Sequence, residues 1–181
     1  MSVMPDYSYI CGKEFVIISD RFYLRRLCVD DATIEYLRWL NDSTVNRFLD
    51  TKKIDIFSLE QYVCDKSFKT DCLLFGIFIK GTKVHIGNVK LEPIENSVAT
   101  VGLLIGNKKY WNKGFATDVL ICIVDFCFNI LDLNMVKLGV KKDNKSAIRV
   151  YEKAGFCIYD KTEDCFKMNI YKTKEMKKEN E

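Results

Sequence analysis

The chain has 181 residues, of which 48% are hydrophobic and 13% aromatic, so it suits one folded domain and excludes a largely disordered chain. A formal net charge of +3 is too small to favour general nucleic-acid binding. Residues 106–153 nevertheless contain nine Lys or Arg against five Asp or Glu, and this local excess suits an anionic ligand.

Eight cysteines occur without a C-x-x-C pair, and His85 is the only histidine. The close ligand spacing of a zinc site is missing, so no metal is expected. Several cysteines lie in apolar runs, which predicts free thiols in a reducing compartment. The N-terminus lacks a signal-peptide pattern and no apolar run reaches membrane-spanning length. We therefore expect a cytoplasmic protein, with no membrane or nucleic-acid partner.

Residues 1–20 are expected to form a lead-in that can include one extra strand. Two short strands are predicted over 14–19 and 21–27. Helical spacing of the apolar residues that follow predicts a helix capped by Asp30 or Asp31.

Ser58 and Gln61 resemble a capping box that opens a second short helix. Three apolar segments then predict an antiparallel meander over Leu73–Ile79, Val84–Leu91 and Val98–Ile105.

The pattern changes in the last third of the chain. It predicts, in order, a long amphipathic helix from Phe115, a strand over Met135–Val140, a helix capped by Asp143 or Asn144 and stopped at Gly155, and strands over Phe156–Asp160 and Phe166–Tyr171. Residues 172–181 are expected to be a charged tail. This order of elements predicts a mixed α/β domain.

The stretch Gly106–Leu120 joins an apolar strand to the long helix through a loop that contains Gly114 and Ala116. Amides at a helix start lack intrahelical partners, and the helix dipole adds positive potential there. Small residues let an anion approach these amides, and three nearby lysines agree with its sign. The stretch predicts a phosphate site, with a plain turn as the alternative.

Two motifs resemble the GNAT superfamily of acyl-CoA-dependent N-acetyltransferases. Ile105-Gly106 followed by Tyr110–Thr117 resembles the family's pyrophosphate loop, Q/R-x-x-G-x-G/A, and Asp143–Phe156 resembles its late helix and exit turn. Trp111 in the Q/R position resembles the branch of ribosomal-protein alanine and amino-sugar acetyltransferases. The resemblance covers about residues 21–171. It implies an α/β (α+β) fold, with a mostly antiparallel sheet of about seven strands and about four helices.

The resemblance further implies acetyl-CoA as the acyl donor, held without a metal. Loop amides are expected to bind its diphosphate, and the edge of the preceding strand its pantetheine arm. The expected contacts are Leu103, Leu104 and Ile105 on the strand, Trp111, Asn112, Lys113, Gly114, Phe115, Ala116 and Thr117 in the loop, and Asn144 and Ser146 at the later helix.

The expected catalytic residue of the late helix is Tyr151, whose phenol would protonate the departing thiolate. Simple packing on an amphipathic helix is the alternative for Tyr151. Asn144 would contact the pantetheine or the acceptor, or act as a plain helix cap.

The general base is less evident in this sequence. Thr100 stands where many relatives carry the glutamate of A-E-x-G, and a threonine cannot deprotonate an ammonium. His85 is the natural candidate because of its pKa range, although a lone strand histidine is often structural. Asp42, Glu92 and Glu95 could orient the amine instead, or the protein could use no base.

The acceptor is expected to be a primary amine bound by Asp42, Asn46, Arg47, Phe48 and Thr100. A small molecule such as a nucleotide-linked amino sugar, with its phosphates near Arg47, fits this polar set. A peptide N-terminus is the alternative acceptor, and a non-catalytic acyl-CoA-binding module is the alternative function. Either a monomer or a homodimer is compatible with the sequence.

Overall fold

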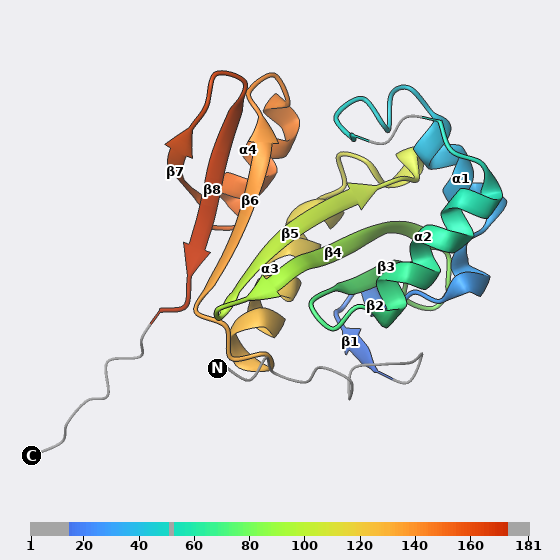
Figure 1. Ribbon diagram of the computed structural model, residues 1–181, viewed down its shortest axis with the longest axis horizontal. Helices are drawn as coiled ribbons and strands as arrows, with labels where there is room; N and C mark the ends of the chain where they lie inside the picture. Colours follow the sequence, from blue (N-terminus) through green and yellow to red (C-terminus); the bar gives the residue numbers. More distant parts are fainter. Residues whose placement is uncertain (1–14, 51–52, 174–181) are drawn as a thin grey trace, which may run out of the picture.

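Eight strands form one sheet in the computed structural model, which describes residues 15–50 and 53–173 (Figure 1). The strands are β1 (Val16–Ile18), β2 (Phe22–Arg26), β3 (Leu73–Ile79), β4 (His85–Glu95), β5 (Val98–Ile105), β6 (Met135–Lys141), β7 (Cys157–Lys161) and β8 (Cys165–Tyr171). Their order across the sheet is β1-β2-β3-β4-β5-β6-β8-β7, and only the β5–β6 pair is parallel. The predicted mixed, mostly antiparallel fold is confirmed.

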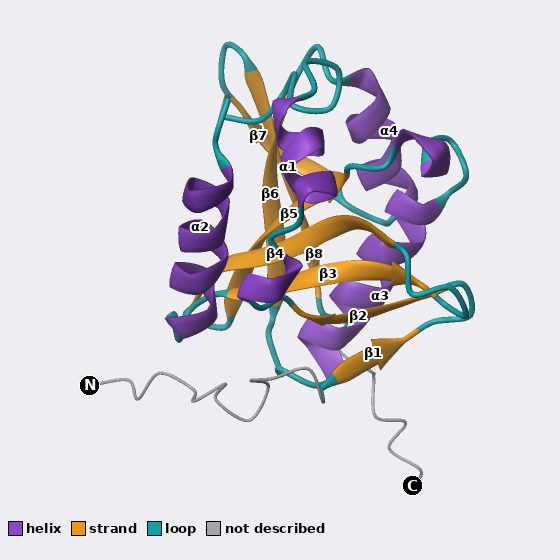
Figure 2. Ribbon diagram, turned by 90° about the vertical axis from the view of Figure 1, so that its right-hand side faces the viewer, coloured by secondary structure: helices purple, strands orange, loops and turns teal. Residues whose placement is uncertain are grey.

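Four α-helices in the described residues cover the two faces of this sheet (Figure 2). On one face lie α1 (Ile34–Asn41) and α2 (Ile56–Phe68), and on the other lie α3 (Phe115–Asn129) and α4 (Lys145–Lys153). The larger apolar core fills the side of α3 and α4, and a smaller one lies beneath α1 and α2.

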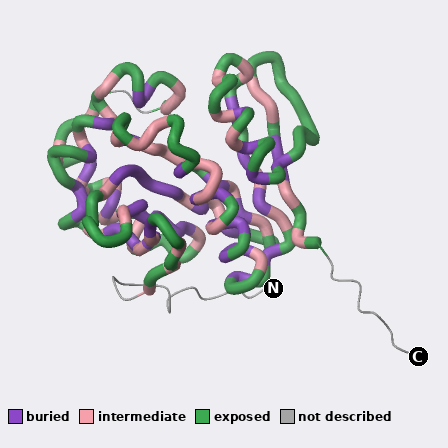
Figure 3. The backbone as a smooth tube through the Cα atoms, turned by 180° about the vertical axis from the view of Figure 1, so that it is seen from behind, coloured by how far each residue is buried: buried purple, intermediate pink, exposed green. Residues whose placement is uncertain are grey.

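Burial follows this layering (Figure 3). The central strand β3 is almost wholly buried, whereas every residue of the edge strand β7 is exposed. No helix within the described part of the chain is long and apolar enough to cross a membrane.

The predicted helix caps were wrong for both early helices. Thr33 begins α1 by accepting a hydrogen bond from the Tyr36 amide (3.2 Å), because Asp31 lies in a preceding 3-10 turn and pairs with Arg25. In α2 the cap is Asp55, which accepts from the Ser58 amide (2.7 Å). An aspartate or threonine three residues ahead of a free amide can serve equally well, so sequence alone does not choose between candidates.

The central feature for function is where β5 and β6 part. They pair over only three positions, Val98–Thr100 with Met135–Lys137, and then diverge (Figure 1). Beyond that point β5 still pairs with β4, and β6 with β8. One edge of β5 and one edge of β6 therefore face each other without forming a ladder.

Candidate active site

The start of α3 presents backbone amides without side-chain caps. Gly114 stands at the N-cap with a left-handed backbone (φ 82°), and the N–H groups of residues 115–117 precede the first intrahelical bond. The other three α-helices of the described chain begin with capping side chains, from Thr33, Asp55 and Asn144. The predicted phosphate loop is therefore the helix start that lacks an internal acceptor.

The loop before Gly114 is held in a defined shape. Asn112 has a positive φ of 57°, which asparagine tolerates better than most residues. The Trp111 indole donates to the carbonyl of Ile105 (2.7 Å), which ties the loop to the end of β5. The predicted strand and loop contacts thus adjoin one another.

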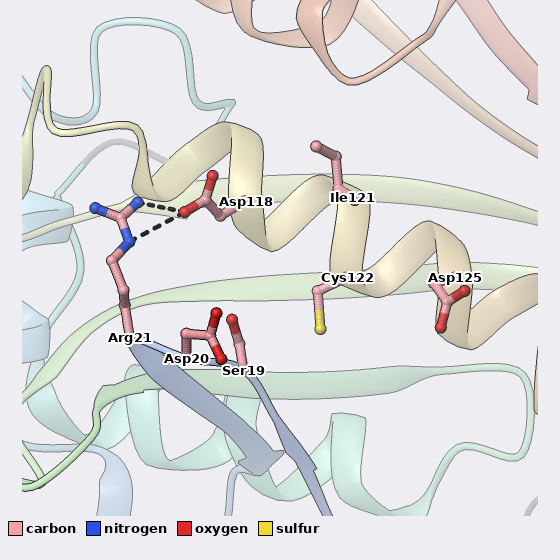
Figure 4. A pocket seen from close by; sticks show the side chains of 7 residues that line it. All are labelled: Ser19, Asp20, Arg21, Asp118, Ile121, Cys122 and Asp125. Carbon is pink, nitrogen blue, oxygen red and sulfur yellow. Dashed lines mark hydrogen bonds and ion pairs between the residues drawn. The ribbon is translucent and has the colours of Figure 1, made fainter.

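Arg21, just before β2, forms hydrogen bonds to this loop and to the first turn of α3, although it is distant in sequence (Figure 4). Its guanidinium donates to the carbonyl of Lys113 (2.9 Å) and to the carboxylate of Asp118, and lies 4.3 Å from the ring centroid of Phe115. Arg21 and Asp118 also line a surface groove between the β1–β2 turn and α3. Sequence reasoning missed Arg21, because no local pattern links residues that are 97 positions apart.

The open edge of β5 exposes alternate backbone groups. The Gly106 amide donates to the carbonyl of Ile86 (2.9 Å), and hydrogen-bonding direction alternates along an antiparallel strand. Leu103 and Ile105 therefore direct their backbone groups away from β4, towards the divergence from β6. Leu104 directs its own towards β4, so of the three predicted strand contacts it is the one whose amide and carbonyl both face the neighbouring strand. The Ile105 carbonyl, on the open edge, accepts from the Trp111 indole.

Two predicted residues of α4 have different surroundings. Tyr151 is 9% exposed, lies in the larger core and packs edge-on against Phe156. Burial raises the pKa of Tyr151, so its phenol stays protonated at neutral pH. Asn144 caps α4, since its Oδ1 accepts from the Ala147 amide (3.2 Å) and the Ser146 hydroxyl (3.1 Å).

His85 lies beneath α1, among the rings of Tyr36, Trp39 and Phe78. Its Nε2 is 2.9 Å from the carbonyl oxygen of Gly87 and 2.9 Å from Oδ1 of Asn88. A carbonyl can only accept, so Nε2 carries the proton and donates. Burial lowers the pKa of His85. These surroundings suit a structural histidine better than a general base.

The predicted acceptor segment spans the divergence of β5 and β6 through two ion pairs. Asp42 pairs with Lys108 after β5 (2.5 Å), and Arg47 with Asp143 after β6 (4.0 Å). The hydrogen bond from Lys108 lowers the pKa of Asp42. These two predicted residues are therefore joined to the loops on both sides of the site.

The other predicted acceptor residues are uncharged, so they make no ion pair to the loops around the site. The Arg47 guanidinium lies 5.0 Å from the ring centroid of Phe48, whereas Asn46 is buried and donates to the carbonyl of Leu40 (2.6 Å). Thr100 lies on β5 at the last position that pairs with β6.

The predicted loop carboxylates Glu92 and Glu95 instead belong to β4. Among residues 15–50 and 53–173, no three His, Cys, Asp or Glu side chains gather as metal ligands would.

An amide-lined helix start, an open strand edge beside it and a buried phenol on the adjoining helix are the three features that the sequence led us to expect of an acyl-CoA site. Residues 21–157 match the family model described as "Acetyltransferase (GNAT) domain". The chain belongs to this family and is an N-acetyltransferase.

Curated relatives agree with this assignment. The chain is 27% identical over 146 residues to N-acetyltransferase p20 of Bacillus licheniformis, itself uncharacterised, covering 77% of this chain and 81% of the relative. It is 26% identical over 129 residues to acetyltransferase PseH of Campylobacter jejuni, covering 71% of this chain and 79% of the relative.

Solved structures share the fold. A GNAT-family acetyltransferase from Bacillus anthracis superposes with a TM-score of 0.76 at 19% identity, covering 87% of this chain and 98% of that one. Spermidine N-acetyltransferase from Vibrio cholerae, solved with CoA and spermine, also gives 0.76 at 22% identity, covering 84% and 96%.

Proposed function

We propose that this N-acetyltransferase transfers the acetyl group of acetyl-CoA to a primary amine of a small molecule, for example a nucleotide-linked amino sugar. The observation that carries the proposal is the uncapped start of α3 beside the open edge of β5. A small acceptor is supported by the spermidine N-acetyltransferase among the structural neighbours. We assign residues 21–171 to the acetyltransferase domain. The predicted lead-in over 1–20 and charged tail over 172–181 lie mostly outside the described residues.

The chain's own groups fit the coenzyme. The N–H groups of residues 115–117 suit a diphosphate, because they lack intrahelical acceptors and stand at the positive end of the helix dipole. Leu103 and the amide of Ile105 suit the amide groups of the pantetheine arm. The Trp111 indole occupies the Ile105 carbonyl and so positions the loop rather than the coenzyme.

Bound acetyl-CoA supplies an acetyl group activated as a thioester. Tyr151 holds a proton at its phenol oxygen for the sulfur that leaves. Direct transfer to the amine is favoured over an acyl-cysteine, because no cysteine lies in the coenzyme loop or in the motif of α4. Burial also raises the pKa of the two buried thiols, Cys72 to about 11 and Cys127 to about 12. Thiols with such pKa values carry little of the nucleophilic thiolate at neutral pH.

No side chain is assigned as general base. Thr100 has no basic group, and Nε2 of His85 already donates to two oxygens. We propose that the amine reacts in its neutral form and that water removes the proton after attack. The protein's contribution is then positioning, which can account for a large part of an enzyme's rate enhancement.

Incubation of the protein with isotopically labelled acetyl-CoA and separate metabolite and peptide pools, read by mass spectrometry, tests this function. Label on small amines supports it, and label on peptide N-termini alone replaces it with the peptide alternative. Calorimetry with CoA tests the coenzyme site. CoA binding with no labelled product, and equal thiol release by wild type and Tyr151→Phe, would indicate a non-catalytic module.

A further inference from the structure

The face of β4 that looks towards α2 carries polar residues in succession. Side chains alternate along a strand, and Val89 and Leu91 belong to the core on the α3 side. Asn88, Lys90 and Glu92 therefore face the opposite side, where Lys90 lies 6.0 Å from the ring centroid of Tyr62 on α2. Polar side chains on a sheet face that is covered by a helix are unusual, and they are a common feature of binding sites.

Glu92 is surrounded by three ammonium groups. Lys66 and Lys69 reach it from the end of α2, Lys69 at 3.0 Å, and Lys90 reaches it at 2.9 Å from the same strand. Burial opposes ionisation of Glu92, but the lysine hydrogen bonds outweigh it and lower the pKa of Glu92 to about 2. Asp71 adds a second negative charge near Lys69. The cations still outnumber the carboxylates, in a place where Lys66 and Glu92 are only 15% and 13% exposed.

The sheet is uncovered immediately beside Lys90. Gly102 of β5 is the register partner of Lys90, and a Cβ added at Gly102 would meet no atom within 4 Å. Gly102 is exposed and precedes Leu103, at the part of β5 that diverges from β6. The Lys90 side chain is 33% exposed. A ligand that reaches the divergence across this face would therefore pass over Gly102 with Lys90 at its side.

Asn88 adds a hydrogen-bond donor to the same strip. His85 donates to Oδ1 of Asn88, which fixes the amide so that Nδ2 points away from the imidazole. Nδ2 is buried, and within residues 15–50 and 53–173 its polar neighbour is the Tyr36 hydroxyl, with which it does not reach hydrogen-bonding geometry. A buried donor without a partner is costly, and an oxygen-bearing ligand would satisfy it.

We propose that Asn88, Lys90 and Gly102 form an acceptor strip that binds an anionic group of the amine, either a carboxylate or a phosphate. The inference rests on the proposed function and narrows its substrate class to amines that also carry such an anion. With strands about 4.8 Å apart, the anion would lie on the order of 10 Å from an amine placed between β5 and β6. The negative charge of Glu92 is already balanced by its lysine partners, so a polyamine would meet an excess of positive charge at this strip.

Matched acceptor pairs test the preference. The ratio of kcat/KM between glucosamine 6-phosphate and glucosamine, and between 4-aminobutyrate and 4-aminobutanamide, is measured for the wild type. We expect a ratio above about 10 for at least one pair, and the pair that shows it distinguishes phosphate from carboxylate. Ratios near one, or a higher kcat/KM for spermidine, would overturn the inference while leaving acetyl transfer intact.

The variant Lys90→Gln should lower that ratio by about 10-fold, the effect of one charge-assisted contact. Lys69→Gln, at a more exposed site, should lower it by about 2- to 5-fold and serves if Lys90→Gln fails to fold. Lys161→Gln, on the exposed edge strand β7, is the matched control and should keep the wild-type ratio. A ratio unchanged in both Lys90→Gln and Lys69→Gln contradicts the assignment.

Calorimetry separates failure of this inference from failure of the proposed function. If no amine is acetylated, titration of glucosamine 6-phosphate and 4-aminobutyrate into the CoA-bound protein still tests whether the strip binds an anionic group. Binding of either that weakens about 10-fold in Lys90→Gln supports it. Equal binding by the variant, or no binding to the wild type, refutes it.

Discussion

Arg21 neutralises Asp118 at the point where the coenzyme's diphosphate is expected. Asp118 lies in the first turn of α3, one residue after the amides of 115–117, and its carboxylate alone would repel a phosphate. The guanidinium of Arg21 pairs with that carboxylate and also holds the Lys113 carbonyl. One side chain thus sets both the charge and the shape of the loop.

Arg21→Ala should raise the Kd for CoA by about 10-fold, because it uncovers the charge of Asp118 and releases the loop. Calorimetry measures the change, and Arg38→Ala, which removes an exposed ion pair on α1, is the control. Adding Asp118→Asn to Arg21→Ala should restore part of the affinity. Unaltered CoA affinity in folded Arg21→Ala would show that the ion pair does not serve the coenzyme.

Gly114→Val should raise the Kd for CoA by about 100-fold or more, since a branched side chain would crowd the amides that bind the charged diphosphate. The change also strains a backbone at φ 82°. Gly81→Val controls for that strain, because Gly81 has φ 84° in the β3–β4 turn, where an added Cβ meets nothing within 4 Å. Equal CoA binding by folded Gly114→Val and Gly81→Val would refute the phosphate site.

Elements with a strong local signal were predicted well. The apolar runs Leu73–Ile79 and Val98–Ile105 form strands over those same residues, because a short apolar run is itself a local signal of a buried strand. Gly155 ends α4 with a φ of 93°, as its position after the helix indicated. The strand β4 ran further than expected, to Glu95, because its turn uses Asn96 and the next residue.

The candidate site likewise contains residues that a local motif could predict and residues that only the folded structure brings together. The coenzyme loop is contiguous in sequence, so its residues could be named from a motif. Arg21 reaches the loop through side-chain hydrogen bonds, and Lys90 of the proposed acceptor strip stands beside Gly102 through strand pairing. Both links join segments that are distant in sequence and leave no local pattern. His85 was a candidate base because of its residue type alone, and only the rings and oxygens around it indicate a structural role.

His85→Phe should lower the free energy of unfolding by about 1–3 kcal/mol, because it leaves the oxygens of Gly87 and Asn88 without their donor. The pH dependence of kcat/KM should keep its wild-type shape. Urea unfolding and a pH–rate profile measure the two quantities. Loss of an ionisation near neutral pH from the profile would instead support His85 as the base.

The stability of the wild type should also fall in mild acid. Burial lowers the pKa of His85 below its unfolded value of about 6.5, so below that pH the unfolded chain binds a proton that the folded chain does not. The contribution of His85 is therefore complete above about pH 6.5 and decreases as the pH falls towards the folded-state pKa of His85. Urea unfolding of wild type and His85→Phe at pH 7.5 and 5.5 should show a smaller decrease in the variant.

Tyr151→Phe should lower kcat by about 10- to 1000-fold, at or somewhat below the range for loss of a general acid, while the Kd for acetyl-CoA changes little. The ring and its packing against Phe156 are kept, so only the proton donor is removed. Tyr159→Phe, on the exposed strand β7, is the matched control. Steady-state thiol release gives kcat, and calorimetry gives the Kd.

The pH dependence of wild-type turnover offers an independent check on the same phenol. Burial raises the pKa of Tyr151 above its ordinary value of 10, so the hydroxyl should still carry its proton at pH 9, where more of the amine is neutral. Turnover at pH 9 should therefore equal or exceed that at pH 7. A decline between these values that disappears in Tyr151→Phe would mean that the phenol ionises early, and an equal loss of coenzyme binding in the variant would mean that Tyr151 acts through packing.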